Sequence, residues 1–427
     1  MKVFGITAPM TGSGKTTVTL AFLSRLKNST GFKIGPDYID GGLSSRVTGN
    51  RTWNIDRWIQ GKAYSSVLAG AASKYDYGVV EGVMGLYDSG SPINMSTYYY
   101  FRKFSIPYVL VIDVSKLAES AYYIAKSFIT RFTLGVVINR YASQRHLEMV
   151  SKPFTEHGIP IIGAIPREDR FTVPERHLGL HTGQEMDDIL EKASLVSNYL
   201  EMEFIENLPE REFQQPSPAR ISGGGKKIWI ALDRAFNFYY ADSIWALERI
   251  GNVNYFSPVS GEYPENPDMV YFGGGYPELY APELSANHAL SGMIRDYSES
   301  GGNIIAECGG LMYLEKEMET ESGVYSLGAP GIVTVCAGSS DCVLWQRKEQ
   351  NSGLATSGCR YRDRNNHGLL RTLQNARYSP AAECDHWCHI LYRGSHNRGC
   401  NRSPGLPGCH NEDLSLQLTI LILDFFS

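Results

Sequence analysis

Short runs of apolar, largely β-branched residues recur along the first 170 positions, with more polar segments between them. The runs are continuous rather than alternating, which is typical of strands in a parallel sheet that is covered on both faces. The segments between them are long enough for the helices that connect parallel strands. The pattern therefore predicts an α/β domain. Its predicted strands cover residues 3–9, 77–83, 107–114, 133–140 and 160–166.

The same alternation returns after residue 226. Residues 227–233 and 269–275 have the pattern of strands, 238–251 that of a helix, and 301–318 that of a strand, a turn and a helix. The second half is therefore also predicted to be α/β.

Between the two patterns lies a stretch of different composition. Residues 206–226 are rich in Pro, Gly, Ser and charged residues, which is typical of a linker. We therefore predict one domain over residues 1–205 and a second over 227–325. The chain length of 427 residues agrees, because it exceeds what one hydrophobic core usually serves.

Composition narrows the classes of function. The chain is 43% hydrophobic and 20% charged, its formal net charge is −5, and its mean hydropathy is −0.23. This balance provides no broad positive field for nucleic acid. No apolar run reaches the roughly 18 residues that span a bilayer, and Gly and Pro interrupt the start too early for a secretory signal. We expect a cytoplasmic protein that binds small molecules, with no nucleic-acid or membrane partner.

A glycine-rich turn follows the first predicted strand and precedes a helical pattern. Backbone N–H groups in such a turn can surround phosphate oxygens, Lys15 can neutralise the β and γ phosphates, and Thr16 can ligate Mg²⁺. Pro9 stands where the strict motif has glycine, so the loop is a variant, and a turn that binds nothing is the alternative. The residues predicted to bind ATP here are Gly12, Ser13, Gly14, Lys15, Thr16 and Thr17.

Carboxylates lie at or after the ends of several of the predicted strands or turns. They are Asp37 and Asp40, Glu81 and Asp88, and Asp113. Carboxylates at the carboxyl ends of parallel strands meet at one edge of the sheet, where they can bind a metal or a ligand. Each alone is more often a solvated loop acid, but next to a phosphate-binding loop we interpret them as one site.

Cys308 lies between a predicted strand and a predicted helix, in the sequence Ala306-Glu307-Cys308-Gly309-Gly310. This is the position of a nucleophile at a sharp strand-to-helix turn, where the turn exposes the sulfur and the helix N-terminus is expected to lower the pKa of the thiol. The N–H of Gly309, and Gly274 from the turn at 272–278, are candidate oxyanion donors. The alternative is a buried structural cysteine.

Eight ordered segments give the chain a family resemblance. They are TGSGKTT, KIGPDYID, NIDRW at 54–58, EGVMGLYD, PERHLGL at 174–180, DRAFNFYY at 233–240, FGGGYPE and AECGGLMYL. Through them the chain resembles the cobyrinic acid a,c-diamide synthase family, which includes enzymes acting on nickel sirohydrochlorin. The resemblance implies a P-loop, parallel-sheet synthetase domain similar to dethiobiotin synthetase, and a class I glutamine amidotransferase α/β domain.

The resemblance also implies an activity. ATP would phosphorylate the a and c carboxylates of cobyrinic acid or a related tetrapyrrole, and ammonia released from glutamine at Cys308 would replace the phosphate. By the resemblance, Thr16, Asp37 and Glu81 would bind Mg²⁺, and Tyr38, Asp40 and Asp88 would position substrate. Asn139 would contact adenine. The same chemistry on nickel sirohydrochlorin, and a P-loop ATPase switch that ligates nothing, remain alternatives, and a homodimer stays open.

The resemblance ends near residue 325. Residues 326–427 contain seven of the eight cysteines and five of the ten histidines, with nine arginines against one lysine, whereas residues 1–325 have sixteen arginines and fourteen lysines. The catalytic histidine and its acidic partner expected of the family have no counterpart there. We therefore hypothesise that this tail is a frameshifted translation, with a divergent terminal region as the alternative. The Cys spacings of the tail fit no usual zinc pattern well.

Overall fold

The computed structural model describes residues 1–89, 94–171, 188–213, 225–320 and 322–327, and four short strands at 335–336, 342–348, 355–361 and 389–393. The chain divides into two compact units. Unit 1 comprises Met1–Ala219 and Tyr240–Asp242, and unit 2 comprises Arg220–Tyr239 and Ser243–Ser427.

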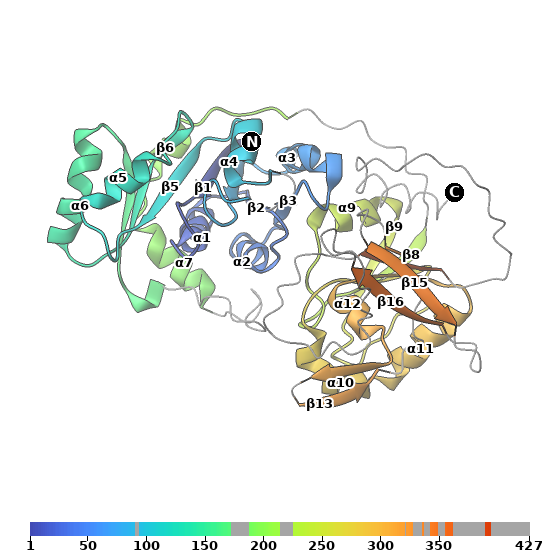
Figure 1. The fold of residues 1–427 in the computed structure, drawn as a ribbon. Coiled ribbons are helices and arrows are strands. Elements are labelled where there is room, and N and C mark those ends of the chain that lie inside the picture. The colour runs from blue at the N-terminus through green and yellow to red at the C-terminus, as the bar shows by residue number, and fades with distance from the viewer. Residues whose placement is uncertain are drawn as a thin grey trace, which may run out of the picture. The chain divides into compact units, whose positions relative to one another are not determined.

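Unit 1 is built on a seven-stranded sheet in the order β3-β2-β4-β1-β5-β6-β7, and every strand pair in it is parallel (Figure 1). Its strands are β1 Lys2–Thr7, β2 Ser29–Ile34, β3 Trp53–Ile55, β4 Tyr77–Glu81, β5 Tyr108–Asp113, β6 Thr133–Tyr141 and β7 Ile161–Pro166. Its helices are α1 Lys15–Arg25, α2 Ile39–Thr48, α3 Val67–Ala72, α4 Thr97–Lys103, α5 Ser120–Lys126, α6 Gln144–Glu156, α7 Ile189–Ser197 and α8 Glu203–Glu206, with the 3₁₀-helices η1 Gly61–Ser66 and η2 Asp169–Phe171.

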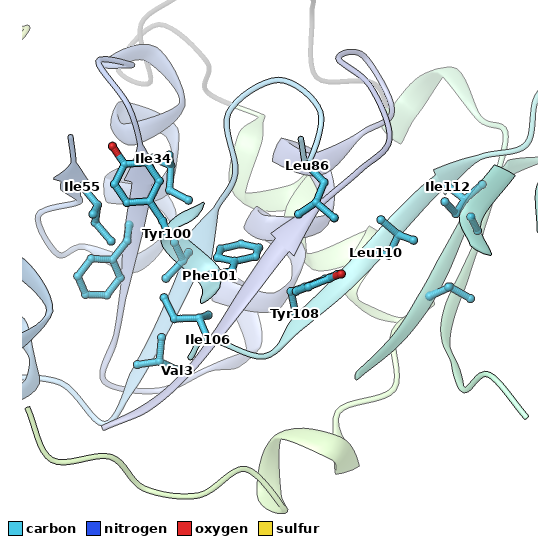
Figure 2. Packing of buried hydrophobic residues seen from close by; sticks show 14 of the residues in the cluster. Val3, Ile34, Ile55, Leu86, Tyr100, Phe101, Ile106, Tyr108, Leu110 and Ile112 are labelled. Atoms are coloured by element: carbon cyan, nitrogen blue, oxygen red, sulfur yellow. The ribbon is translucent and has the colours of Figure 1, made fainter. Parts of the chain in front are cut away.

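The strands of unit 1 are buried on both faces, as their continuous apolar runs predicted. Successive residues of one strand enter different core clusters: Val79 packs with Phe22 of α1, and Val80 packs with Phe101 of α4. Figure 2 shows the second cluster, in which the ring of Phe101 lies beside that of Tyr108 at the start of β5, with centroids 5.4 Å apart. The predicted fold class is therefore confirmed for this unit.

Two strands of unit 1 were not predicted. The sequence of β2 is STGFKI, in which only two residues are apolar, and β3 has three residues. Neither carries the apolar run that marked the other five. Because all seven strands are parallel, their carboxyl ends share one edge of the sheet, and the loops after β1, β2 and β4 all leave from that edge.

Unit 2 is built on a six-stranded sheet in the order β14-β17-β11-β10-β8-β9. The four strands β9, β8, β10 and β11 run parallel, and β17, which comes from the tail, runs antiparallel to β11. Unit 2 also holds two hairpins, β12-β13 and β15-β16. Its strands are β8 Lys226–Ala231, β9 Gly251–Phe256, β10 Met269–Phe272, β11 Asn303–Glu307, β12 Glu317–Thr320, β13 Gly323–Ser326, β14 Val335–Cys336, β15 Cys342–Lys348, β16 Ala355–Tyr361 and β17 His389–Arg393. Its helices are α10 Ala281–Ala286, α11 His288–Glu299, α12 Gly309–Tyr313 and the 3₁₀-helix η3 Pro277–Tyr280, while α9 Ala241–Ile250 starts in unit 1 and continues into unit 2.

Within the described ranges, none of the helices combines the length and the apolar character needed to cross a bilayer.

Candidate active sites

The glycine-rich segment after β1 forms a loop that leads directly into α1. Gly14 is the N-cap of α1 with φ +94°, and a Cβ atom there would lie 2.2 Å from Nδ2 of Asn139. Glycine is therefore required at this position. The Ser13 hydroxyl holds the loop by donating to the Met10 carbonyl at 2.9 Å, and Lys15, the first residue of α1, is 7% exposed. The predicted phosphate-binding residues thus form one continuous loop and first helical turn.

Asn139 and Arg140, at the end of β6, contact this loop from a strand that lies two positions from β1 in the sheet. Asn139 Nδ2 donates to the Ser13 carbonyl at 2.9 Å, and Arg140 Nη1 donates to the Gly12 carbonyl at 3.1 Å. Arg140 also forms an ion pair with Asp113 at 2.7 Å. Asn139, which by the resemblance would contact adenine, thus uses its side-chain amide nitrogen on the loop itself.

A cavity of about 260 Å³ opens beside the loop, between the carboxyl ends of β6 and β7. Thr17 and Asn139 line it, so it is continuous with the phosphate-binding loop. The remaining lining residues are Ser115, Lys116, Arg140, Ile165, Pro166, Arg167, Glu168, Asp169 and Phe171. The segment that follows β7 was not identified from the sequence.

Three of the predicted carboxylates surround a lysine that the sequence analysis did not single out. Lys33 Nζ lies 2.5 Å from Asp40, 2.9 Å from Glu81 and 3.5 Å from Asp37. All four side chains are at most 9% exposed. Burial alone would lower the pKa of Lys33, but the three carboxylates outweigh it and hold the pKa above its ordinary value. The lysine is therefore charged throughout the neutral range.

Glu81 connects this cluster to the phosphate-binding loop. Its Oε1 accepts from the Thr16 hydroxyl at 2.8 Å and from Lys33, whereas its buried Oε2 has no hydrogen-bond partner. Burial raises the pKa of Glu81, and Lys33 opposes that rise. An unpartnered carboxylate oxygen beside a Thr hydroxyl is the donor set that Mg²⁺ prefers, so these residues fit the predicted ion. Within the described ranges, no group of three or more His, Cys, Asp or Glu residues has the arrangement of a metal site made by protein alone.

The two other residues predicted to position substrate lie in different surroundings. Tyr38 is half-buried between Asp37 and Asp40 on the loop after β2. Asp88 is exposed, and its Oδ2 accepts from the Gly85 N–H at 2.9 Å, which closes a turn. That turn packs on the phosphate-binding loop, since a Cβ atom at Gly85 would lie 2.4 Å from the Pro9 carbonyl oxygen. Asp88 thus lies beside the loop but outside the Lys33 cluster.

Cys308 has the strained backbone of a nucleophile at a strand-to-helix turn. It lies between β11 and α12 with φ +49° and ψ −112°, and its side chain is half-buried with a free thiol. A non-glycine residue with this φ is uncommon and costs free energy, which favours a functional cysteine over a structural one.

The pKa of the Cys308 thiol differs from the prediction. We expected the helix N-terminus to lower it, and that expectation is wrong: burial raises the pKa to about 11. The N–H groups of Gly309 and Gly275 act in the lowering direction, and Glu278 and Glu307 add to the rise. Helix α12 has five residues, too few for a large dipole to oppose desolvation.

Gly274, the second predicted oxyanion donor, does not direct its N–H to the sulfur in this structure. The N–H of Gly274 donates to the Phe238 carbonyl at 3.3 Å, so it is engaged elsewhere, while the N–H of Gly275 is directed to the sulfur. Gly309 and Gly275 are therefore the pair of donors at Cys308 in this structure. Glu278 lies close enough to act on the thiol, and its buried Oε2 has no hydrogen-bond partner.

Several predicted features lie outside the described residues. One is the segment at 174–180; the tail histidines His367, His386, His396 and His410 and the cysteines Cys384 and Cys388, to which the sequence assigned no role, also lie outside, and of His389 only the strand is described. In the described side chains of unit 2 the one histidine is His288, which is exposed at the start of α11.

Comparisons with known proteins assign different domain families to the two parts of the chain. Residues 4–180 match the model of the CobQ/CobB/MinD/ParA nucleotide binding domain, and residues 227–337 match that of the CobB/CobQ-like glutamine amidotransferase domain. A cobyrinate a,c-diamide synthase from Fusobacterium nucleatum is 36% identical over 353 residues, which cover 77% of this chain and 79% of that protein. The chain belongs to the cobyrinate a,c-diamide synthase family.

A second cobyrinate a,c-diamide synthase, from Saccharolobus solfataricus, is 33% identical and covers 75% of this chain and 77% of its own length. Membership of the cobyrinate a,c-diamide synthase family confirms the predicted nucleotide-binding and glutamine amidotransferase domains and the predicted class of enzyme, a glutamine-dependent carbon-nitrogen ligase. Among solved structures, a putative plasmid partition protein from Borrelia burgdorferi has a TM-score of 0.29 and 12% identity to this chain. The match covers 45% of this chain and 97% of that protein.

Proposed function

We propose that the chain uses ATP to activate the a and c carboxylates of cobyrinic acid as acyl phosphates, and that nitrogen from glutamine or free ammonia then replaces the phosphate. One observation carries the proposal: the phosphate-binding loop and the Lys33 carboxylate cluster meet through the Thr16–Glu81 hydrogen bond at one edge of the unit 1 sheet. A transferred phosphoryl group and its acceptor would both have to be held at such an edge.

The chemistry explains why two activities belong in one chain. A carboxylate is a poor acyl donor because oxide would have to leave, whereas phosphate leaves readily from an acyl phosphate. In the first step, an oxygen of the substrate carboxylate attacks the γ-phosphorus of ATP, and ADP leaves. Ammonia then attacks the carbonyl carbon, and inorganic phosphate departs with the original carboxylate oxygen while ammonia loses a proton. Lys15 would stabilise the charge on the phosphoryl group during the first step.

The residues at this edge would hold Mg²⁺ as well as substrate. Thr16 and Glu81 would ligate the ion, with Asp37 close by, and the ion would neutralise charge on the β and γ phosphates. Asp40 and Tyr38 would position the substrate carboxylate. The lined cavity beside Thr17 and Asn139 would hold the nucleoside part of ATP.

Two alternatives use the same geometry. Nickel sirohydrochlorin carries comparable carboxylates, and nothing in the described residues distinguishes it from cobyrinic acid as substrate. A P-loop ATPase switch would hydrolyse ATP without forming an amide, and the strained Cys308 backbone argues against it because a switch needs no thiol nucleophile.

The glutaminase half favours free ammonia as the nitrogen donor for this chain. A thiol with a pKa of about 11 is almost entirely protonated near neutral pH and needs a base to become a nucleophile. We infer that the tail, as a frameshifted translation, does not supply that base. If the nucleotide sequence has no alternative frame that encodes a late His–acid pair, the frameshift hypothesis is wrong.

The test of the function is product mass. The full-length protein is incubated with ATP, Mg²⁺ and each macrocycle, with either ammonium or glutamine. We expect two successive replacements of a hydroxyl by an amino group, with ammonium as the better donor and one ADP formed per amide. ATP hydrolysis with no change of mass would support the switch instead, and equal rates with both donors would contradict the account of Cys308.

A further inference from the structure

Two segments that contribute to the family resemblance, NIDRW at 54–58 and the end of DRAFNFYY at 233–240, have no role in the site described above. The structure brings them together. Tyr240 belongs to unit 1 together with Ala241 and Asp242, although these residues follow the linker in the chain. Tyr240 is 4% exposed, and its hydroxyl donates to Oδ2 of Asp56 at 2.8 Å.

Asp56 is a fixed acceptor rather than a solvated acid. It is fully buried, and its Oδ1 accepts from the N–H groups of Trp58 at 2.7 Å and Ile59 at 3.3 Å. Its own N–H donates to Oε1 of Gln60 at 2.9 Å. A buried carboxylate with this many donors has one orientation, so the Tyr240 hydroxyl has one position.

The network continues to the loop that carries the carboxylates. Gln60 Nε2 donates to the Asn54 carbonyl at 3.1 Å and to Asp242 at 3.0 Å. Asn54 Nδ2 in turn donates to the carbonyls of Gly35 at 3.0 Å and Asp37 at 3.1 Å. The polar groups that fix Tyr240 therefore also fix the backbone of the loop after β2.

Tyr240 reaches the same loop directly through its ring. The rings of Tyr38 and Tyr240 are stacked, with centroids 5.0 Å apart and an interplanar angle of 26°. Tyr38 stands between Asp37 and Asp40, two of the three carboxylates around Lys33. Tyr240 thus contacts the ring of Tyr38 on this loop. Its hydrogen-bond partner, Asp56, belongs to the network that holds the loop backbone.

We propose that Tyr240 is a positioning residue for the tetrapyrrole carboxylate, which acts by holding Tyr38 and the loop 35–40 in the conformation that accepts the substrate. The proposal rests on the proposed function for the identity of the substrate. Tyr240 does not touch the phosphate-binding loop in any described contact, so it affects the macrocycle and not ATP.

The test compares full-length Tyr240→Phe, which removes the hydroxyl and keeps the ring, with Tyr240→Leu, which removes both. The matched control is Tyr108→Phe. Tyr108 is a buried tyrosine of unit 1 at the start of β5, and its hydroxyl donates to the Phe128 carbonyl at 2.6 Å. Ammonium is the nitrogen donor in every assay, so the state of Cys308 does not enter.

We expect Tyr240→Phe to raise the KM for cobyrinic acid by about threefold or more, which corresponds to part of one hydrogen bond to a charged group, and Tyr240→Leu to raise it further. The KM for ATP should stay within about twofold of the wild type, since no contact to the ATP site is lost. Tyr108→Phe should leave both constants unchanged. An unchanged macrocycle KM in both Tyr240 variants, or equal rises in both constants, would overturn the proposal.

A second measurement does not depend on the substrate. Amide hydrogen exchange of residues 35–42 should be faster in Tyr240→Phe than in the wild type, and unchanged in Tyr108→Phe. Unchanged exchange in Tyr240→Phe and Tyr240→Leu would overturn the positioning role by itself. A wild-type protein that amidates no macrocycle would instead reject the proposed function, and the exchange result would still decide whether Tyr240 holds the loop.

Discussion

Lys33, near the end of β2 in unit 1, and Cys308, directly after β11 in unit 2, are both ionisable groups whose charged form desolvation disfavours, yet the pKa of each responds differently. Three carboxylates within 3.5 Å outweigh desolvation at Lys33, and the lysine keeps its proton. Nothing in the described surroundings of Cys308 does the same for the thiolate, because the charged groups that act on it are carboxylates.

The difference shows what a site needs besides the right residue at the right turn. Desolvation penalises a charge in either unit, and only a partner of opposite charge reverses the penalty. Unit 1 contains such partners within its own described residues. In unit 2 the motif supplies the strained turn and two backbone donors, but the charge that would activate the thiol must come from elsewhere.

Among substitutions at these sites, removal of Lys33 should have the largest effect on the stability of unit 1. In Lys33→Met three buried carboxylates lose their common partner, and we expect the free energy of unfolding of unit 1 to fall by about 3–5 kcal/mol. Urea denaturation at pH 7 measures this loss. The control Lys152→Met removes an exposed ion pair of 3.9 Å and should cost at most about 0.5 kcal/mol. Equal losses in the two variants would show that the cluster does not depend on Lys33.

The same variant has a predicted pH dependence. Burial raises the pKa of Glu81, and without Lys33 this carboxyl holds its proton more tightly in the folded than in the unfolded state. The stability of Lys33→Met should therefore increase as the pH falls from 7 to 5. Wild-type Lys33 stays charged over that range because its pKa is raised. The difference in free energy of unfolding between the wild type and the variant should therefore become smaller as the pH falls. A constant deficit would contradict this reading of the cluster.

Lys15 tests whether unit 1 performs phosphoryl transfer on its own. Lys15→Ala should lower ammonium-dependent ATP turnover at least about a hundredfold, since a preorganised positive group is lost from the transition state. A coupled assay of ADP release with cobyrinic acid measures this. Lys152→Ala, at a side chain 72% exposed on α6, is the control and should retain full turnover. Unaffected turnover in Lys15→Ala would place phosphoryl transfer elsewhere.

Substitutions at Gly14 and Gly49 distinguish the cost of backbone strain from damage to the phosphate-binding loop. Gly14→Ala and Gly49→Ala both place a side chain at positive φ, +94° and +68°, and both should lose about 1–2 kcal/mol of stability. Only Gly14→Ala also drives a Cβ atom into the Asn139 amide, since Gly49 has nothing within 4 Å. ATP titration should therefore show weaker binding in Gly14→Ala alone. Equal ATP affinity in the two variants would mean that the Asn139 contact does not shape the loop.

The smallest expected effect concerns Cys308. Its pKa of about 11 instead of 9.0 leaves about a hundredfold less thiolate near pH 8 than an ordinary thiol. Alkylation by iodoacetamide, followed by mass spectrometry of the Cys308 peptide from pH 7 to 11, should rise up to the top of this range. Glu278→Gln removes a negative neighbour and should speed alkylation severalfold at pH 8, whereas the exposed Glu283→Gln should not. An alkylation rate that is already maximal at pH 8 would refute the raised pKa.

The sequence predicted those parts of the two sites that are contiguous in the chain. The phosphate-binding loop and the Cys308 turn each lie between one strand and the next helix, so a local pattern contains them whole. Lys33 could not be assigned in this way. It lies inside β2, a strand that its composition does not reveal, and it meets Glu81, 48 positions away, only when the sheet forms.

Tertiary structure also decides details that a local sequence pattern does not contain. Which of three successive glycines directs its N–H to the sulfur depends on the conformation of the turn, where Gly274 binds Phe238 and Gly275 has φ +149°. The direction of the Cys308 pKa shift depends on burial, which a motif does not encode. The partnership of Tyr240 with Asp56 spans 184 positions and has no local signal at all.

The transfer of oxygen from substrate to phosphate tests the central claim most directly. Cobyrinic acid labelled with ¹⁸O in its carboxylates is amidated with ATP and ammonium, and the inorganic phosphate is analysed by mass spectrometry. The account predicts one ¹⁸O atom in phosphate for each amide formed, because the carboxylate oxygen attacks the γ-phosphorus. Amide formation with unlabelled phosphate would show that ATP is cleaved without activating the acid.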